Sequence, residues 1–344
     1  MADIQSGRVA RAVVLGDGGW GTALALILCR RGIETTVWSN FPAHAEELGR
    51  TRENARYLPG VRLPESLRFT ADPHSAAHDV DFAVSAVPTQ FLRGVAERFE
   101  DALAGKVPIV SASKGLEIET LRRPSEILAE VLGPRPIAVL SGPSHAEEVA
   151  RGKPASVVVA SRDEALARLA QDTFNSDAFR VYTSSDPDGV ELGGALKNVI
   201  AIAAGISDGL ELGDNAKAAL LTRGMVEMAR VGVARGARME TFFGLAGIGD
   251  LVTTCCSKHS RNRSVGEQIG RGETLEAVLG RMKMVAEGVW TTKALFGPES
   301  ELSGVSMPIA AEVHAVLFEH KDPRDAVTDL MRREPAPEMK GLIR

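Results

Sequence analysis

The residues that constrain the fold most lie in the stretch VVLGDGGWGTALALIL, residues 13–28. Its first three residues, Val13 to Leu15, are apolar and end at a glycine, which predicts a short buried strand. Residues 22–30 contain good helix formers and neither Gly nor Pro, so we expect a helix there. Four glycines and a tryptophan separate the two elements. A strand that turns into a helix through so much unprotected backbone is typical of a ligand-binding turn in an α/β fold.

The glycine spacing suggests which ligand this turn accepts. Gly16, Gly18 and Gly21 have the GxGxxG spacing of a dinucleotide-binding turn. The first glycine permits the tight turn, the second lets the backbone approach a pyrophosphate, and the third lets helix and strand pack closely. The phosphates would then face free N–H groups at the helix N-terminus. The alternative is a glycine-rich turn without a ligand.

The rest of the first half alternates short β-rich runs with helical stretches, the pattern of a doubly wound parallel sheet. The further expected strands are 35–39, 80–88, 107–113, 136–143, 155–161 and 179–185. After residue 187 the chain shows no convincing strand, and Gly209 and Gly213 are expected helix ends. We therefore predict an α/β protein with a Rossmann-type dinucleotide-binding domain over 1–187 and an all-helical substrate and catalytic domain over 188–344.

Composition limits the class of protein. A chain of 344 residues exceeds the usual size of a single core, so two domains are expected. The net charge of −5 argues against nucleic-acid binding. No uninterrupted apolar run reaches the roughly 18–20 residues needed to span a bilayer, and the N-terminus has no secretory apolar region. Three cysteines fit a reducing cytoplasm, and the seven histidines form no cluster, so we expect no metal.

The end of the second expected strand bears on the choice between NAD and NADP. A site that demands NAD usually has Asp or Glu there to bind the ribose 2′-hydroxyl. Here Ser39 and Asn40 occupy the position, so no carboxylate repels a 2′-phosphate and no arginine is in place to bind one. The sequence predicts tolerance of both NADH and NADPH.

Hydride transfer to a ketone also needs a proton donor of tuned pKa. Two lysines in uncharged surroundings are candidates: Lys114, after a strand, and Lys197, within an apolar helix. Burial would lower the pKa of Lys197 towards working pH. Asp250 lies in a glycine-flanked apolar stretch where a carboxylate needs a partner, and Lys197 is the natural one. The alternatives are a surface lysine at 197 and an exposed turn lysine at 114.

Two segments suit contacts to a phosphorylated substrate. Ser260, Arg261 and Asn262 combine a helix-start residue, a guanidinium and an amide, a set that suits a phosphate monoester. The segment SGPSHAEEV (141–149) offers small residues and N–H donors where a strand gives way to a helix. A plain helix cap and a simple Gly-Pro turn are the alternatives.

Taken together, seven blocks in order resemble the bacterial NAD(P)-dependent glycerol-3-phosphate dehydrogenases, over nearly the whole chain. They are GDGGWGTALA, SASKGLE, SGPSHAEEVARGKPA, the long stretch from ELGGALKN to LLTRG, GLAGIGDLVTTC, SRNR and AEGV. The resemblance implies an oxidoreductase that reduces dihydroxyacetone phosphate to sn-glycerol 3-phosphate with NADH or NADPH, reversibly, for glycerophospholipid synthesis in the cytoplasm. It also implies a homodimer.

The resemblance also implies roles for individual residues. Lys197 matches the residue that exchanges the proton, with Asp250 positioning it, and Asn198 and Thr254 resemble polar neighbours of that lysine. Positions matching glycerol 3-phosphate contacts are Lys114, Gly142, Ser144, Lys197, Asp250, Ser260, Arg261 and Asn262. Positions matching the cofactor site are Gly16, Gly18, Gly19, Trp20, Gly21, Asn40, Lys114, Ala146, Arg261, Val285 and Glu287.

Three residues depart from the family pattern. Asp17 replaces a small neutral residue, and its carboxylate should repel a pyrophosphate unless it points to solvent. Gly19 replaces a common serine, and Asn40 stands where arginine is frequent. Two rival functions stay open at this point. One is that of a related dehydrogenase acting on another 2- or 3-hydroxy acid. The other is that of a non-catalytic protein that senses NAD(P).

Overall fold

The structure, a computed structural model, describes residues 9–103, 105–282, 284–298, 300, 302 and 304–338. The chain divides into two compact units. The first unit comprises residues 1–113 and 124–187, and the second comprises residues 114–123 and 188–344. Whether these units correspond to separately folding domains with a boundary at 187 stays a prediction.

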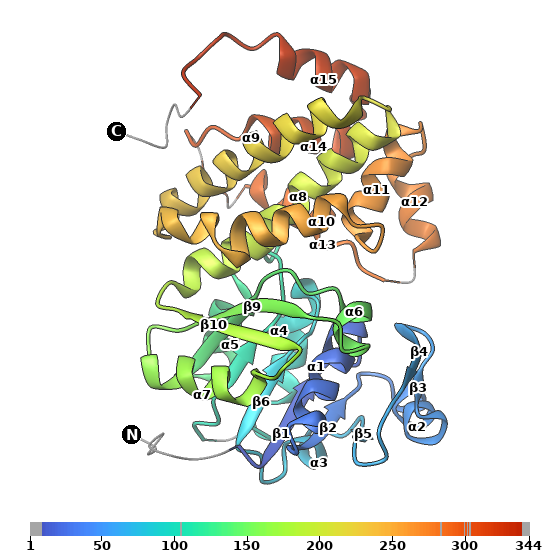
Figure 1. Cartoon of the computed structure of the whole chain (residues 1–344), viewed down its shortest axis with the longest axis vertical. Helices are drawn as coiled ribbons and strands as arrows, with labels where there is room; N and C mark the ends of the chain where they lie inside the picture. The colour runs from blue at the N-terminus through green and yellow to red at the C-terminus, as the bar shows by residue number, and fades with distance from the viewer. Residues whose placement is uncertain are drawn as a thin grey trace. The chain divides into compact units, whose positions relative to one another are not determined.

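An eight-stranded sheet forms the centre of the first unit (Figure 1). From edge to edge the strands are β10 (Phe179–Ser184), β9 (Ala155–Ala160), β8 (Ile137–Ser141), β7 (Ile109–Ser111), β6 (Phe82–Ser85), β1 (Arg11–Leu15), β2 (Glu34–Trp38) and β5 (Arg68–Thr70). Neighbouring strands are parallel except β8 and β9. The six strands from β5 to β8 follow the Rossmann order 3-2-1-4-5-6. The predicted fold class is confirmed.

Both faces of this sheet are buried, as a doubly wound fold requires. Strand β1 shows this by alternation, because Val14 packs into one apolar cluster with Leu24 and Leu28, whereas Val13 and Leu15 pack into another. The helices of this unit are α1 (Gly19–Arg30), α2 (Pro42–Thr51), α3 (Pro73–Ala77), α4 (Thr89–Arg98), α5 (Pro124–Leu132), α6 (Ala146–Ala150) and α7 (Glu164–Phe174).

The seven expected strands are present, but the sequence missed three others. Strand β5 has only three residues, half-buried or exposed, and so carries no apolar signal. The hairpin of β3 (Glu53–Asn54) and β4 (Leu58–Arg62) contains Pro59 and Gly60, which argue against a strand. Helix α1 begins at Gly19, three residues before its predicted start, because the glycine turn itself enters the helix.

The described residues of the second unit form helices and no strand, which confirms the predicted all-helical C-terminal part. The helices are α8 (Pro187–Gly209), α9 (Gly213–Ala234), α10 (Asp250–Cys256), α11 (Arg261–Gly270), α12 (Leu275–Arg281), α13 (Glu287–Leu295), α14 (Pro308–Phe318) and α15 (Pro323–Met331), with short turns η1 (Met239–Phe243) and η2 (Leu245–Gly249). Gly209 ends α8 and Gly213 begins α9, as expected.

Helix α8 is the central helix of this unit. Its 23 residues are long enough and apolar enough, by length and composition alone, to cross a membrane, although the sequence analysis expected no such segment. Yet 94% of its most apolar window is buried inside the protein, which is typical of the core helix of a globular unit. The charged residues that interrupt the apolar run, Glu191 and Lys197, are both buried.

Glycines bring the backbones of α8 and α11 into direct contact. A Cβ atom at Gly205 would lie 1.9 Å from the carbonyl oxygen of Arg263, and one at Gly266 would lie 2.0 Å from that of Ile202. Larger side chains at these positions would force the helices apart. The contact therefore fixes the start of α11 relative to α8.

We expect Gly205→Ala to lower the free energy of unfolding by roughly 1–3 kcal/mol or more, because the backbone must shift to accommodate the methyl group. Chemical denaturation followed by circular dichroism measures this. Gly280→Ala is the control, since a Cβ there would meet nothing within 4 Å. It should be neutral or stabilising by up to about 1 kcal/mol. Equal effects of the two substitutions would contradict the close contact.

Candidate active site

Three charged side chains meet in the second unit. Lys197, in the middle of α8, places its Nζ 2.9 Å from Oδ1 of Asp250, the first residue of α10. Lys114 places its Nζ 2.6 Å from the other oxygen, Oδ2. The side chains of Lys197 and Asp250 are 7% and 3% exposed. The ion pair expected from the sequence is present, and a second lysine shares the carboxylate.

Burial dominates the electrostatics of this group. Loss of solvent lowers the pKa of Lys197 to about 8, partly offset by the attraction of Asp250 and reinforced by the repulsion of Lys114. For Asp250, burial acts to raise the pKa, but the ammonium groups of Lys114 and Lys197 outweigh it and hold the pKa below its usual value. Lys197 is therefore a lysine that can exchange a proton near neutral pH, beside a carboxylate that stays ionised.

Polar neighbours fix the position of these charges. Lys197 Nζ donates to Oγ1 of Thr254 at 2.5 Å, one turn along α10 from Asp250. Asn198 Oδ1 accepts from Nδ2 of Asn262 at 2.9 Å. Asn262 Oδ1 in turn accepts from the backbone N–H of Gly288 at 2.9 Å. A hydrogen-bonded chain thus links α8, α11 and α13.

The segment 114–123 belongs to the second unit for clear physical reasons. Leu116 and Leu121 are buried in the apolar core of that unit. Arg123 donates to the carboxylates of Asp188 and Glu191 at the start of α8. These contacts bring Lys114 to Asp250. The residues themselves placed Lys114 only by its position after a strand, and it was the family resemblance that grouped it with Lys197 and Asp250 as a substrate contact.

The start of α11 holds the three residues expected to bind phosphate. Ser260 Oγ accepts from the N–H of Arg263, so the helix-cap interpretation is correct for its structural role. Arg261 is exposed, whereas Asn262 is buried and already bonded to Asn198 and Gly288. Of the three residues, Arg261 is the exposed one, whereas Asn262 is held by protein partners.

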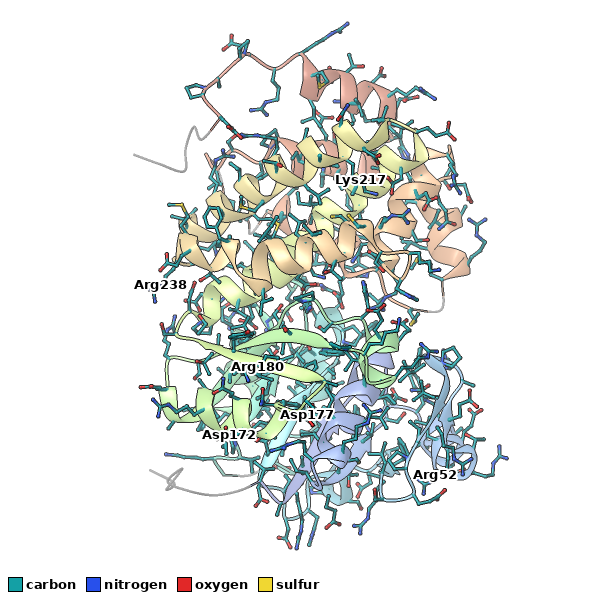
Figure 2. All side chains as sticks on the ribbon, in the orientation of Figure 1. Arg52, Asp172, Asp177, Arg180, Lys217 and Arg238 are labelled. Carbon is teal, nitrogen blue, oxygen red and sulfur yellow. The ribbon has the colours of Figure 1, made fainter. Side chains whose placement is uncertain are left out.

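A half-buried ion-pair network also contacts this helix. Asp208, near the end of α8, contacts Nε of Arg263 at 2.8 Å and Nζ of Lys217 at 2.8 Å. Figure 2 labels Lys217 on helix α9. The network joins α8, α9 and α11, and the sequence analysis missed it because its members are 55 and 9 residues from Asp208.

The remaining expected residues lie in both units. Val285 and Glu287 are half-buried in the second unit, where Glu287 is the first residue of α13. Gly142, Ser144 and Ala146 lie in the first unit, between β8 and the start of α6. Gly142 has φ of 131°, and Ser144 Oγ donates to its carbonyl oxygen at 2.9 Å. This geometry is compatible both with a simple Gly-Pro turn and with a turn that contacts a ligand.

The glycine turn of the first unit has the features a dinucleotide needs. Gly16 has φ of 107°, and a Cβ at Gly21 would lie 2.1 Å from the carbonyl oxygen of Gly16. At Gly18, which caps α1, a Cβ would meet nothing within 4 Å. The first turn of α1 carries no acidic side chain. Gly16 and Gly21 thus satisfy the steric demands of the turn, while the backbone at Gly18 is open to an approaching pyrophosphate.

Two departures from the family pattern have structural explanations. Asp17 does not point to solvent, because the residue is only 8% exposed. Its Oδ2 accepts from Oγ of Ser39 at 2.6 Å and lies 2.6 Å from Nδ1 of His44. At Gly19 a Cβ would lie 2.7 Å from the carbonyl oxygen of Tyr57, so a serine would not fit without movement.

The end of β2 differs from the expectation. The sequence analysis found no arginine in place there, which is wrong. Arg98, the last residue of α4, donates through Nη1 to Oδ1 of Asn40. Its Cζ lies 4.9 Å from the centre of the Trp38 ring. An arginine distant in sequence therefore lies beside the position that follows the second strand.

A dinucleotide turn on a Rossmann sheet and a buried lysine of lowered pKa are features of a nicotinamide-dependent oxidoreductase. Among the described residues no group of three or more His, Cys, Asp or Glu is arranged to hold a metal ion. Models for the N-terminus and C-terminus of NAD-dependent glycerol-3-phosphate dehydrogenase match residues 11–167 and 186–328. The chain belongs to the NAD-dependent glycerol-3-phosphate dehydrogenase family.

Individual relatives agree with this assignment. A protein of Chlorobium phaeobacteroides (strain BS1) named glycerol-3-phosphate dehydrogenase (NAD(P)+) is 49% identical over 332 residues, covering 96% of this chain and 99% of that protein. The crystal structure of glycerol-3-phosphate dehydrogenase from Coxiella burnetii is 38% identical with a TM-score of 0.90, covering 94% and 99%. A ketopantoate reductase from Ralstonia eutropha, 16% identical with a TM-score of 0.58 and covering 92% and 99%, shares the fold alone.

We expect Asp250→Asn to lower the free energy of unfolding at pH 7 by roughly 3 kcal/mol or more, because it leaves two lysines without their buried counter-ion. Chemical denaturation provides the measurement. Asp329→Asn, which removes a carboxylate from an exposed pair with Lys321, should cost far less, because solvent screens that pair. A double variant with Lys197→Met should regain part of the loss. An Asp250→Asn protein as stable as the Asp329→Asn protein would contradict the buried pairing.

Proposed function

We propose that this chain reduces dihydroxyacetone phosphate to sn-glycerol 3-phosphate, reversibly, with Lys197 as the residue that exchanges the proton. The observation that carries the proposal is the geometry of Lys197, a buried ammonium 2.9 Å from a buried carboxylate, with its pKa lowered to about 8. A ketone reductase needs a proton donor whose pKa lies near working pH, and this setting provides one.

The residues of the first unit fit a nicotinamide dinucleotide. Gly16, Gly18 and Gly21 would hold the pyrophosphate at the N-terminus of α1, where N–H groups and the helix dipole favour negative charge. Trp20, which lies within this turn between Gly18 and Gly21, carries a buried indole Nε1 with no acceptor among the described residues. When bound, the reduced nicotinamide supplies the hydride.

The N-terminus of α11 would hold the phosphate of the substrate. Arg261 offers an exposed guanidinium at the first position of a ten-residue helix whose first turn carries no acidic side chain. Ser260, as the cap, keeps the backbone N–H groups of that turn aligned. Anchoring the phosphate away from the reacting carbon lets remote binding energy orient the ketone. Lys114 helps to orient the three-carbon body.

Lys197 and Asp250 would carry out the proton transfer. As the ketone carbon gains a hydride, its oxygen takes a proton from the ammonium of Lys197, which becomes a neutral amine. Asp250 holds the ammonium in place and stays ionised throughout. In the reverse direction the neutral amine removes the proton from the alcohol. Thr254 Oγ1 accepts from a second N–H of the ammonium group.

The proposed setting is the cytoplasm, where the product feeds glycerophospholipid synthesis, and the proposed assembly is a homodimer. The family supports the reaction. The three cysteines, all free in the structure, are compatible with a reducing compartment.

The direct test follows loss of NADH and of NADPH absorbance when dihydroxyacetone phosphate is added. Lys197→Ala should reduce turnover by about 10²–10⁴-fold, because the acid is lost, while the protein stays folded and binds NADPH. Lys293→Ala, which removes an exposed lysine of α13, is the matched control and should keep full activity. Wild-type rates from Lys197→Ala, or faster reduction of unphosphorylated keto acids by the wild type, would refute the proposal.

The pH dependence follows from the protonation state that each direction needs. Ketone reduction needs the ammonium form of Lys197, so its rate should fall as pH rises through about 8. Alcohol oxidation needs the neutral amine, so its rate should rise through the same range. Because Asp250 raises the pKa of Lys197, Asp250→Asn should move both midpoints to lower pH. Rates of the two directions that change in parallel with pH would be inconsistent with one group exchanging the proton.

A further inference from the structure

The end of β2 lies directly beside the glycine turn. The N–H of Gly16 donates to the carbonyl oxygen of Trp38 at 3.0 Å, and Leu15 pairs with Trp38 in the sheet. In dinucleotide-binding folds this position faces the adenosine ribose, and the charge there decides between a 2′-hydroxyl and a 2′-phosphate. The charged side chains at this position therefore bear on cofactor choice.

One cationic group lies at this position. The guanidinium of Arg98 stacks over Trp38, with its Cζ 4.9 Å from the ring centre, and donates to Oδ1 of Asn40. Arg98 and Asn40 are both exposed. Among the described residues no carboxylate contacts this guanidinium. Its position is thus set by an aromatic ring and an amide, and its charge is not neutralised by an acidic neighbour.

The nearby anionic group is turned away from solvent. Asp17 Oδ2 accepts from Ser39 and lies against the imidazole of His44, each at 2.6 Å. The side chain of Asp17 is 11% exposed and that of His44 is 8% exposed. The positive charge of Arg98 is therefore exposed to solvent, whereas the negative charge of Asp17 is buried and bonded to its own partners.

We infer that Arg98 binds the 2′-phosphate of NADPH and gives the protein a preference for NADPH over NADH. The inference rests on the proposed use of a nicotinamide dinucleotide. Arg98 reaches the site from α4, whereas Asn40, two residues after β2, is uncharged and orients the guanidinium. Stacking on Trp38 reduces the number of side-chain conformations, so that less entropy is lost when the phosphate binds.

The test compares the binding of adenosine 2′,5′-bisphosphate with that of 5′-AMP by isothermal titration calorimetry on the whole protein. We expect the wild type to bind the bisphosphate at least about tenfold more tightly, as a charge-assisted hydrogen bond predicts. Arg98→Gln should reduce the ratio to less than about threefold, with 5′-AMP binding unchanged. The ratio of kcat/KM for NADPH over NADH should fall in parallel.

Arg93→Gln is the matched control, because it removes the same charge from the same helix, where Arg93 pairs with Glu130. It should leave the wild-type ratio unchanged. A wild type that binds 5′-AMP as well as the bisphosphate, or an Arg98→Gln variant that keeps the ratio, would overturn the inference. Adenylate binding does not involve Lys197, so failure of ketone reduction and failure of this inference are separate results.

Discussion

The contact on which the second unit depends is the ion pair of Lys197 and Asp250. Both side chains are almost fully buried, and their Nζ and Oδ1 atoms lie 2.9 Å apart. Removing two charges from water costs several kcal/mol per ion, which their attraction repays only with good geometry and further hydrogen bonds. Thr254 and Lys114 supply those contacts. The unit therefore has to hold four side chains from three segments at fixed positions.

Close backbone contacts provide that precision. A Cβ at Gly193 would lie 2.5 Å from the carbonyl oxygen of Ala246, so α8 touches the turn that leads into Asp250. A Cβ at Gly288 would lie 2.5 Å from the carbonyl oxygen of Asn198, which brings α13 against the residue after the lysine. These glycines set the distances between helices without any role in chemistry. Positioning of this kind determines whether an ammonium can transfer a proton.

The same group explains why Lys197 is suited to its proposed task. The pKa of an isolated buried lysine would fall so far that the amine would be neutral at working pH, whereas an exposed lysine would keep its ordinary pKa and stay protonated. Burial lowers the pKa and Asp250 limits the decrease, which leaves the group near 8. The carboxylate thus has an electrostatic role as well as a positional one. The pairing also accounts for a carboxylate in a glycine-flanked apolar stretch.

The sequence predicted the strands with an apolar signal and the glycine turn, because burial and backbone conformation leave a local pattern. It failed for β5, which is too short, and for β4, where Pro59 and Gly60 hide the pairing. The Lys197–Asp250 pair could be predicted because each side chain is costly to bury alone. The position of Arg98 could not be predicted, because no local pattern shows that it contacts Asn40, 58 residues away in the sequence. The sequence also did not show that Ser39 and His44 contact Asp17, because these residues are distant from it along the chain.

The most direct measurement is the titration of the lysine side chains themselves, by NMR of protein carrying ¹³C at the lysine ε position. The account predicts one signal with a midpoint near pH 8, well below the others, which disappears in Lys197→Ala. Titration of every lysine above pH 10 would show that the ammonium at position 197 lies in water, and would contradict the account.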